Sequence, residues 1–300
     1  MVPLHLFDAA DGDSFTSALN LGHELLHHLL PAERVDDRFR DTPDRVGVYT
    51  DPAREAGPDG VIAISAAPRR DGSSLPPWSM QMALRPGTED HLCPLVSGSL
   101  PAGGAELWVR PENLAIVNEI GRCWPTAFNC RRLHLMTIDL PVAIEPIATR
   151  ALNPDDENDL EAVVRVNNAA FHSHPDQAGM SVESVRSKLA GVGHSAQGVR
   201  LAEIDGEIKG FCWTQIHHQR MLGEISVIGL HPDVHGRGLG APMTAAGLQW
   251  LYRQGLTTTI LYVEAENTAA VRSYHRLGFE TAHDDVSWII PGAATEEPNV

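Results

Sequence analysis

The most informative absences in this 300-residue chain concern positive charge and long apolar runs. Lysine occurs only twice, at Lys188 and Lys209, and 39 acidic residues outnumber 23 lysines and arginines, for a formal net charge of −16. Because a strongly negative protein repels polyanions, nucleic acid and anionic membranes are not expected partners. No apolar run reaches the roughly 20 residues that a transmembrane helix needs.

Cysteine is also scarce. The chain has four, Cys93, Cys123, Cys130 and Cys212, and no secretory signal is apparent at its start. This pattern predicts reduced thiols and a cytoplasmic location. Cys123 and Cys130 stand near His134 without the spacing of a zinc site, so no metal is expected.

Two common nucleotide-binding motifs, Gly-x-Gly-x-x-Gly and Gly-x-x-x-x-Gly-Lys-Ser/Thr, are missing. The chain has instead a glycine-rich loop at residues 235–240 (HGRGLG). The apolar run from Ile225 to Leu230 predicts a buried strand before this loop, and residues 241–253 have the apolar spacing of a helix after it. Glycines that let an anion approach, placed where helical N–H groups begin, suit a pyrophosphate.

A second strand and helix follow. Residues 257–263 (TTTILYV) are β-branched and apolar and predict a strand. Asn267 is a good helix N-cap and Gly278 a good terminator, so a short helix is expected between them. Residues 284–290 predict a final strand.

In this order, the two segments resemble motifs A and B of the GCN5-related N-acetyltransferases (GNAT). The resemblance implies an α/β fold, in which a mixed, largely antiparallel sheet is flanked by helices, and acetyl-CoA as the co-substrate. The family usually has Gln or Arg where this chain has His235; a neutral imidazole still donates one hydrogen bond, and Arg237 supplies a fixed charge. The implied acetyl-CoA contacts lie on the strand end, the loop and the second helix: Ile228, Gly229, Leu230, His235, Gly236, Arg237, Gly238, Leu239, Gly240, Ala241, Asn267, Thr268, Ala269, Ala270, Val271 and Arg272.

The pattern repeats weakly in the first half of the chain. Residues 107–117 match residues 261–271, which predicts two tandem GNAT-like domains, residues 1–143 and 144–300. Residues 31–60 are rich in Pro, Asp and Arg and are expected to be loop.

The loop of the first copy differs from that of the second. Leu92 and Pro94 stand where Gly238 and Gly240 stand in the second copy. Side chains then occupy the approach of the anion, and proline lacks an N–H to donate. We therefore expect the first domain to be degenerate and structural, or at best a weak CoA site, and the second to be catalytic.

Three further strings lie on the acceptor side: residues 166–171 (VNNAAF), 174–177 (HPDQ) and 211–217 (FCWTQIH). With the tandem layout they resemble the mycothiol synthases, over most of residues 145–290. That family transfers acetyl from acetyl-CoA to the cysteinyl amine of Cys-GlcN-Ins. The implied acceptor contacts are Asp176, Glu224 and Tyr262. The family often has Glu in place of Asp176 and Lys in place of Gln215, so one acceptor contact is in doubt.

The chemistry suits these residue types. An amine that is protonated in solution must lose a proton before it attacks a thioester, and Glu224 is our candidate general base. Tyr274, two helical turns after Asn267, is the candidate general acid for the departing thiolate. The backbone near Leu230 is expected to meet the thioester and to donate an N–H to the developing oxyanion.

Two alternatives stay open at this point. The chain could be a GNAT acetyltransferase for another amine, such as a protein N-terminus, an antibiotic or a polyamine. It could also be a non-catalytic module that binds CoA. The expected partner is a small-molecule amine, and a monomer or weak dimer is expected.

Overall fold

The computed structural model describes residues 4–8, 45–49, 60–66, 75–84, 87–109, 114–172 and 179–292. The chain divides into two compact units: residues 1–132 together with 285–300, and residues 133–284. Two long strands, β6 (Phe128–Asp139) and β12 (Glu280–Ile290), each belong partly to both units. The domain boundary predicted from the sequence lies at 143/144. The division into units differs from it, because the end of β12 belongs to the first unit. In the described part of the chain, no helix is long and apolar enough to cross a membrane.

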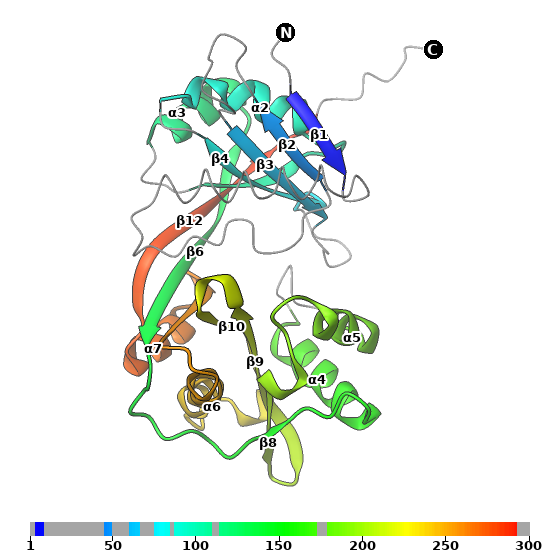
Figure 1. Ribbon diagram of the computed structural model, residues 1–300, viewed down its shortest axis with the longest axis vertical. Helices are drawn as coiled ribbons and strands as arrows, with labels where there is room; N and C mark the ends of the chain where they lie inside the picture. Colours follow the sequence, from blue (N-terminus) through cyan, green and yellow to red (C-terminus); the bar gives the residue numbers. More distant parts are fainter. Residues whose placement is uncertain are drawn as a thin grey trace. The chain divides into compact units, whose positions relative to one another are not determined.

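In the described part of the first unit, the helices α2 and α3 lie on one side of a sheet (Figure 1). The strands run antiparallel from β1 to β4; β4 and β5 are parallel, and β5 pairs antiparallel with the end of β12. Buried side chains such as Ile62, Met80 and Leu107 of the sheet and Leu95 and Ile120 of the helices form its core. The elements are β1 (Leu4–Asp8), β2 (Arg45–Tyr49), β3 (Gly60–Ala66), β4 (Trp78–Leu84), α2 (Leu92–Ser99), β5 (Ala105–Val109) and α3 (Leu114–Cys123).

Two expectations for this unit are wrong. Within residues 31–60, which were expected to be loop, β2 pairs with strands on both sides, and β3 begins at Gly60; strand pairing outweighs local composition here. Cys93 of α2 and Cys123 of α3 form a disulfide with a Cα–Cα distance of 5.9 Å, so the expectation of reduced thiols fails for them. Cys130 and Cys212 are free.

The second unit is a sheet covered on both faces. Its strand order is β12-β6-β11-β10-β9-β8-β7, and β10 and β11 run parallel. The helices α4 and α5 lie on one face, and α6 and α7 on the other (Figure 1). Successive side chains of β9 point to opposite faces of the sheet. Phe211 and Trp213 pack in the core under α4, and Cys212 packs in the core under α6. The elements are β7 (Arg150–Ala151), α4 (Glu157–Ala170), α5 (Val182–Ala190), β8 (Val199–Ile204), β9 (Glu207–His217), β10 (Leu222–Leu230), α6 (Gly240–Arg253), β11 (Thr258–Glu264) and α7 (Thr268–Leu277).

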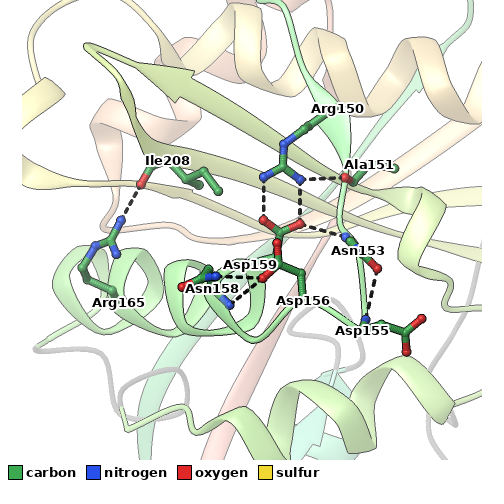
Figure 2. A network of polar contacts seen from close by, with 9 residues as sticks. All are labelled: Arg150, Ala151, Asn153, Asp155, Asp156, Asn158, Asp159, Arg165 and Ile208. Atoms are coloured by element: carbon green, nitrogen blue, oxygen red, sulfur yellow. Dashed lines mark hydrogen bonds and ion pairs between the residues drawn. The ribbon is translucent and has the colours of Figure 1, made fainter.

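An ion pair between the half-exposed Arg150 and the buried Asp159 fixes the start of α4 to the edge of the sheet. Figure 2 shows Arg150 of β7 facing Asp159 of α4 through two parallel contacts, of 2.6 and 2.5 Å. The backbone N–H of Asn153 also donates to Asp159, at 2.9 Å. The Arg150 guanidinium lowers the pKa of Asp159 below its ordinary value, because its hydrogen bonds favour the carboxylate and outweigh the effect of burial.

We predict that Asp159→Asn lowers the free energy of unfolding by about 1.5–3 kcal/mol at pH 7, the usual loss for a hydrogen bond to a charged group. Since the folded-state pKa of Asp159 is lowered, its contribution is present above the unfolded value of about 3.9 and is lost as pH falls through the folded value. Urea titrations at pH 7 and near pH 3 should therefore show a smaller difference from the unmodified chain at the lower pH.

The matched control is Asp156→Asn, three residues earlier. Asp156 caps α4 by accepting from the N–H of Asn158 at 3.0 Å, and Asn is an equally good N-cap. Its effect should be within about 0.5 kcal/mol at pH 7. An equal loss for Asp159→Asn at both pH values would contradict the assignment.

Candidate functional site

The glycine-rich loop has the backbone of an open anion cradle. β10 leads through a short 3-10 turn, Pro232–Val234, into residues 235–239, and α6 begins at Gly240. Gly236 and Gly238 have φ values of 77° and 74°, and a Cβ added at either would meet nothing within 4 Å. The backbone conformation therefore requires these glycines, and the space beside them is open. In the first turn of α6, Pro242 has no N–H and the N–H of Met243 donates to the carbonyl of Leu239 at 3.0 Å. The N–H groups of Gly240 and Ala241, at the helix start, are the ones suited to an anion.

Two side chains of the loop are tied to protein groups. The Nε2 of His235 lies 2.9 Å from the carbonyl oxygen of Leu230, and because a carbonyl only accepts, Nε2 carries the proton. Arg237 contacts Asp205, in the turn between β8 and β9, at 2.7 Å. The hydrogen bond raises the pKa of Arg237 and lowers the pKa of Asp205. His235 thus holds the loop to the end of β10, while Arg237 is held in place by a carboxylate.

The strands β10 and β11 separate soon after they meet. They are paired in parallel at three positions, from Gly223–Thr259 to Ile225–Leu261, although β10 continues to Leu230 and β11 to Glu264. The register of β10 against β9 shifts between Ile225 and Val227, as at a β-bulge. A bulge bends its strand, which turns the end of β10, Ile228 to Leu230, away from β11.

The start of α7 forms the second predicted cofactor surface. The side chain of Asn267 caps the helix by accepting from the N–H of Ala270, at 3.2 Å, and Gly278 ends it with a φ of 103°. The predicted contact residues from Asn267 to Arg272 are exposed or half-buried. A Cβ at Gly240 would lie 3.5 Å from the hydroxyl of Ser273, so α7 packs against the start of α6. Both helix starts that the sequence assigns to acetyl-CoA therefore lie on the same side of the sheet.

Glu224 lies on the opposite face of the sheet, where it contacts a histidine. Its side chain is only 7% exposed, and its Oε2 is 2.9 Å from the Nε2 of His217, which is 15% exposed. Residues that face each other in a ladder share a face, and so do residues two apart along a strand. Glu224 faces Gln215 on β9 and Ile260 on β11. Gln215, His217 and Tyr262 therefore share the α4/α5 face with Glu224.

Tyr274 lies in α7, on the other side of the sheet. Its ring packs edge-on against Phe279, with 5.7 Å between the ring centroids. Burial raises the pKa of the Tyr274 phenol well above its ordinary value, so the phenol keeps its proton at neutral pH. The same effect raises the pKa of the Cys212 thiol to about 12.

Some predicted residues lie elsewhere or have unforeseen partners. Asp176, with the rest of residues 173–178, falls outside the described residues. The Nε2 of Gln215 donates to the carbonyl of Val192 at 3.1 Å. The sequence reasoning assigned no role to His217 or to Asp205. His217 is the last residue of the string 211–217, and the register of β9 against β10, in which it faces Leu222, brings it beside Glu224.

Comparisons with known proteins identify the family of this chain. The model of the Acetyltransferase (GNAT) family matches residues 163–279. The mycothiol acetyltransferase of Streptomyces coelicolor is 40% identical over 239 residues, which cover 77% of each chain. The chain belongs to the mycothiol acetyltransferase family. The mycothiol acetyltransferase of Streptomyces griseus is also 40% identical, over 159 residues that cover 52% of this chain and 51% of that one. In that case the match spans about half the length of the relative.

Solved structures confirm the predicted fold class. A GCN5-related N-acetyltransferase from Sphaerobacter thermophilus superposes with a TM-score of 0.69 at 18% identity, over 97% of this chain and 98% of that one. A tandem GNAT protein from the clavulanic acid biosynthesis pathway gives a TM-score of 0.64 at 14% identity, over 97% and 98%. The family member described here therefore has two tandem GNAT-like folds.

We predict that Gly238→Val weakens acetyl-CoA binding at least tenfold, which corresponds to about 1.4 kcal/mol. A branched side chain would occupy the open space of the loop and would strain a backbone with positive φ. The measurement is isothermal titration with acetyl-CoA.

Gly255→Val provides the matched control. Gly255 has a φ of 86°, and a Cβ added there would meet nothing within 4 Å, but it follows the far end of α6. It therefore carries the same backbone strain away from the loop, and its affinity for acetyl-CoA should be normal. A substitution at Leu92, which aligns with Gly238 in the first copy, would not serve as the control, because Leu92 is fully buried in the first unit. Equal losses of affinity in the two glycine variants would contradict the cradle.

Proposed function

We propose that this chain transfers acetyl from acetyl-CoA to the cysteinyl amine of Cys-GlcN-Ins, giving mycothiol and CoA. The observation that carries the proposal is the placement of Glu224, a buried carboxylate on β10 one residue before the pairing of β10 with β11 ends. Membership of the mycothiol acetyltransferase family supports both the donor and the acceptor. We also propose that residues 144–300 form the catalytic domain and residues 1–143 a structural one.

In this proposal, acetyl-CoA lies along the α6/α7 side of the second unit. The open loop from His235 to Ala241 holds the pyrophosphate through backbone N–H groups. The end of β10, Ile228 to Leu230, extends away from β11 and offers its backbone to the acyl arm. The first turn of α7, from Asn267 to Arg272, borders the same ligand. The net charge of −16 disfavours an anion over the molecule as a whole, so the affinity must come from these local groups.

The acceptor amine approaches from the α4/α5 face. Glu224 attracts the ammonium group and takes one of its protons, which leaves a neutral amine able to attack the thioester carbonyl. A backbone N–H near Leu230 stabilises the oxyanion that develops on that carbonyl. Tyr274 then donates its proton to the departing thiolate. Tyr262 and Asp176 complete the proposed acceptor site.

The separation of β10 from β11 allows the proposed base and the proposed acid to act on the same thioester. Glu224 and Tyr274 lie on opposite sides of the sheet, and closely paired strands would separate them. Because the pairing of β10 with β11 ends at Ile225, a thioester in the gap could meet a base from one face and an acid from the other.

A different GNAT substrate is the nearest alternative, because Gln215 is neutral where the mycothiol synthases often have a lysine. A turnover assay with acetyl-CoA and a panel of amines decides between them. The panel should contain Cys-GlcN-Ins, a polyamine, an aminoglycoside and a peptide with a free N-terminus. Preference for another amine would replace the acceptor, and binding of CoA without any turnover would favour a non-catalytic module.

We predict that Glu224→Gln lowers the rate of acetyl transfer by about 10²–10⁴-fold, the usual contribution of a general base. Acetyl-CoA should still bind normally, because the cradle lies on the other side of the sheet. The measurement is kcat at saturating substrates, together with a titration of acetyl-CoA. Glu207→Gln, at an exposed position of β9, is the control and should keep full activity. Near-normal turnover of Glu224→Gln would remove this residue from the mechanism.

We predict that Tyr274→Phe slows turnover without changing the affinity for either substrate, because the phenol acts only on the leaving group. Since burial raises the pKa of Tyr274 above its ordinary value of about 10, the phenol stays protonated from pH 6 to pH 9. The reduction should therefore be the same factor throughout that range. Tyr252→Phe, in the exposed part of α6, is the control. A defect that vanishes within this pH range would contradict the role of Tyr274 as the acid.

A further inference from the structure

The pairing of Glu224 with His217 raises the question of what the histidine does. The two side chains meet at 2.9 Å between Oε2 and Nε2, and both are largely buried. A buried carboxylate without a donor is strongly disfavoured, so a partner at this position helps to keep Glu224 ionised. The contact joins neighbouring strands of one hairpin, which places it on a rigid part of the fold.

The contact with His217 involves only one of the two carboxylate oxygens of Glu224, Oε2. A carboxylate only accepts hydrogen bonds, so when Glu224 is ionised the Nε2 of His217 carries the proton. That bond fixes Oε2. The terminal torsion of a glutamate is otherwise broad, so a fixed Oε2 also fixes the direction of Oε1.

We propose that His217 is the positioning residue for Glu224, holding Oε2 through its Nε2–H so that Oε1 receives the proton of the acceptor amine. The inference rests on the proposed function, in which Glu224 is the base. In the step itself, the N–H bond of the ammonium breaks and an O–H bond forms at Oε1. The amine keeps the electron pair with which it attacks the thioester.

The surroundings of the pair favour positioning over a general packing role. On the side of α4 that faces the sheet, the buried residues near the strand centre are uncharged: Val163, Val166 and Asn167. Titratable groups on the same face of the sheet include Tyr262 and Glu264 of β11 and Asp139 of β6, which faces Thr258. Lys188 and His194 lie beside Trp213. His217 contacts Glu224 directly.

The first test measures kcat and KM for His217→Ala and His217→Gln. His217→Ala should lower kcat by about 10–100-fold, as expected when a catalytic group is misplaced by about 1 Å, with KM for acetyl-CoA unchanged. His217→Gln keeps an N–H donor and should recover most of the rate. Equal rates in the two variants would overturn the proposal.

The matched control is His134→Ala. His134 pairs with Asp284 at 2.7 Å, with both side chains similarly buried, but its partner has no proposed catalytic role. This variant loses the same kind of interaction and should keep its kcat. If His134→Ala and His217→Ala reduce kcat alike, His217 contributes only to stability and the proposal fails.

The second test needs neither substrate nor turnover. In the 15N spectrum of the full-length chain at pH 8, neutral His217 should be the tautomer with the proton on Nε2, and a proton on Nδ1 would overturn the proposal. This result also decides the case in which His217→Ala does not fold. The proposed acceptor and the role of His217 can also fail separately. If the chain does not acetylate Cys-GlcN-Ins, the proposed acceptor is wrong. The tautomer of His217 and the rescue by His217→Gln, measured with the preferred amine, still test the role of His217.

Discussion

The early separation of β10 and β11 is the constraint on which the site depends. Parallel strands ordinarily continue their ladder, yet these two are paired only from Gly223 to Ile225 on β10. The register shift against β9 that follows Ile225 bends the strand at this point. Packing holds the bent end in place, because a Cβ on Gly229 would collide with the buried ring of Phe211. The glycine at this position lets the end of β10 lie close against β9. The opposite edge of β10 is not paired with β11 there.

In the proposed function, one face of the sheet binds the cofactor and the other holds the base. The side that bears α6 and α7 has the open glycine loop, the exposed start of α7 and the protonated phenol of Tyr274. The side that bears α4 has the buried pair of Glu224 and His217. An ionised carboxylate needs fixed partners, whereas a pyrophosphate needs open space and backbone donors, so the two requirements would conflict within one pocket. Placing them on opposite faces satisfies both.

Local chemistry explains which parts could be predicted from the sequence. The loop and α7 were predictable because Gly238, Asn267 and Gly278 have backbone roles that few other residues can fill. The strand β2 was missed because its pairing with β1 and β3 is not visible in a segment rich in proline and charge. The disulfide between Cys93 and Cys123 depends on how α2 and α3 pack, and the contact between His217 and Glu224 depends on hairpin register. The strand pairing and the disulfide join segments far apart in the sequence, whereas the contact between His217 and Glu224 lies within one hairpin and depends on its exact register.

The loop also shows how this chain accommodates a departure from the family pattern. His235 stands where Gln or Arg is usual, and its Nε2–H is committed to the carbonyl of Leu230. The fixed charge of the loop is therefore that of Arg237, which Asp205 already holds. In a chain with a net charge of −16, Asp205 is the carboxylate that this guanidinium contacts. Because the pair is exposed to solvent, it is weak, and a pyrophosphate with two negative charges can share the guanidinium with Asp205 at little cost. In the proposed function, the turn between β8 and β9 therefore belongs to the cofactor side.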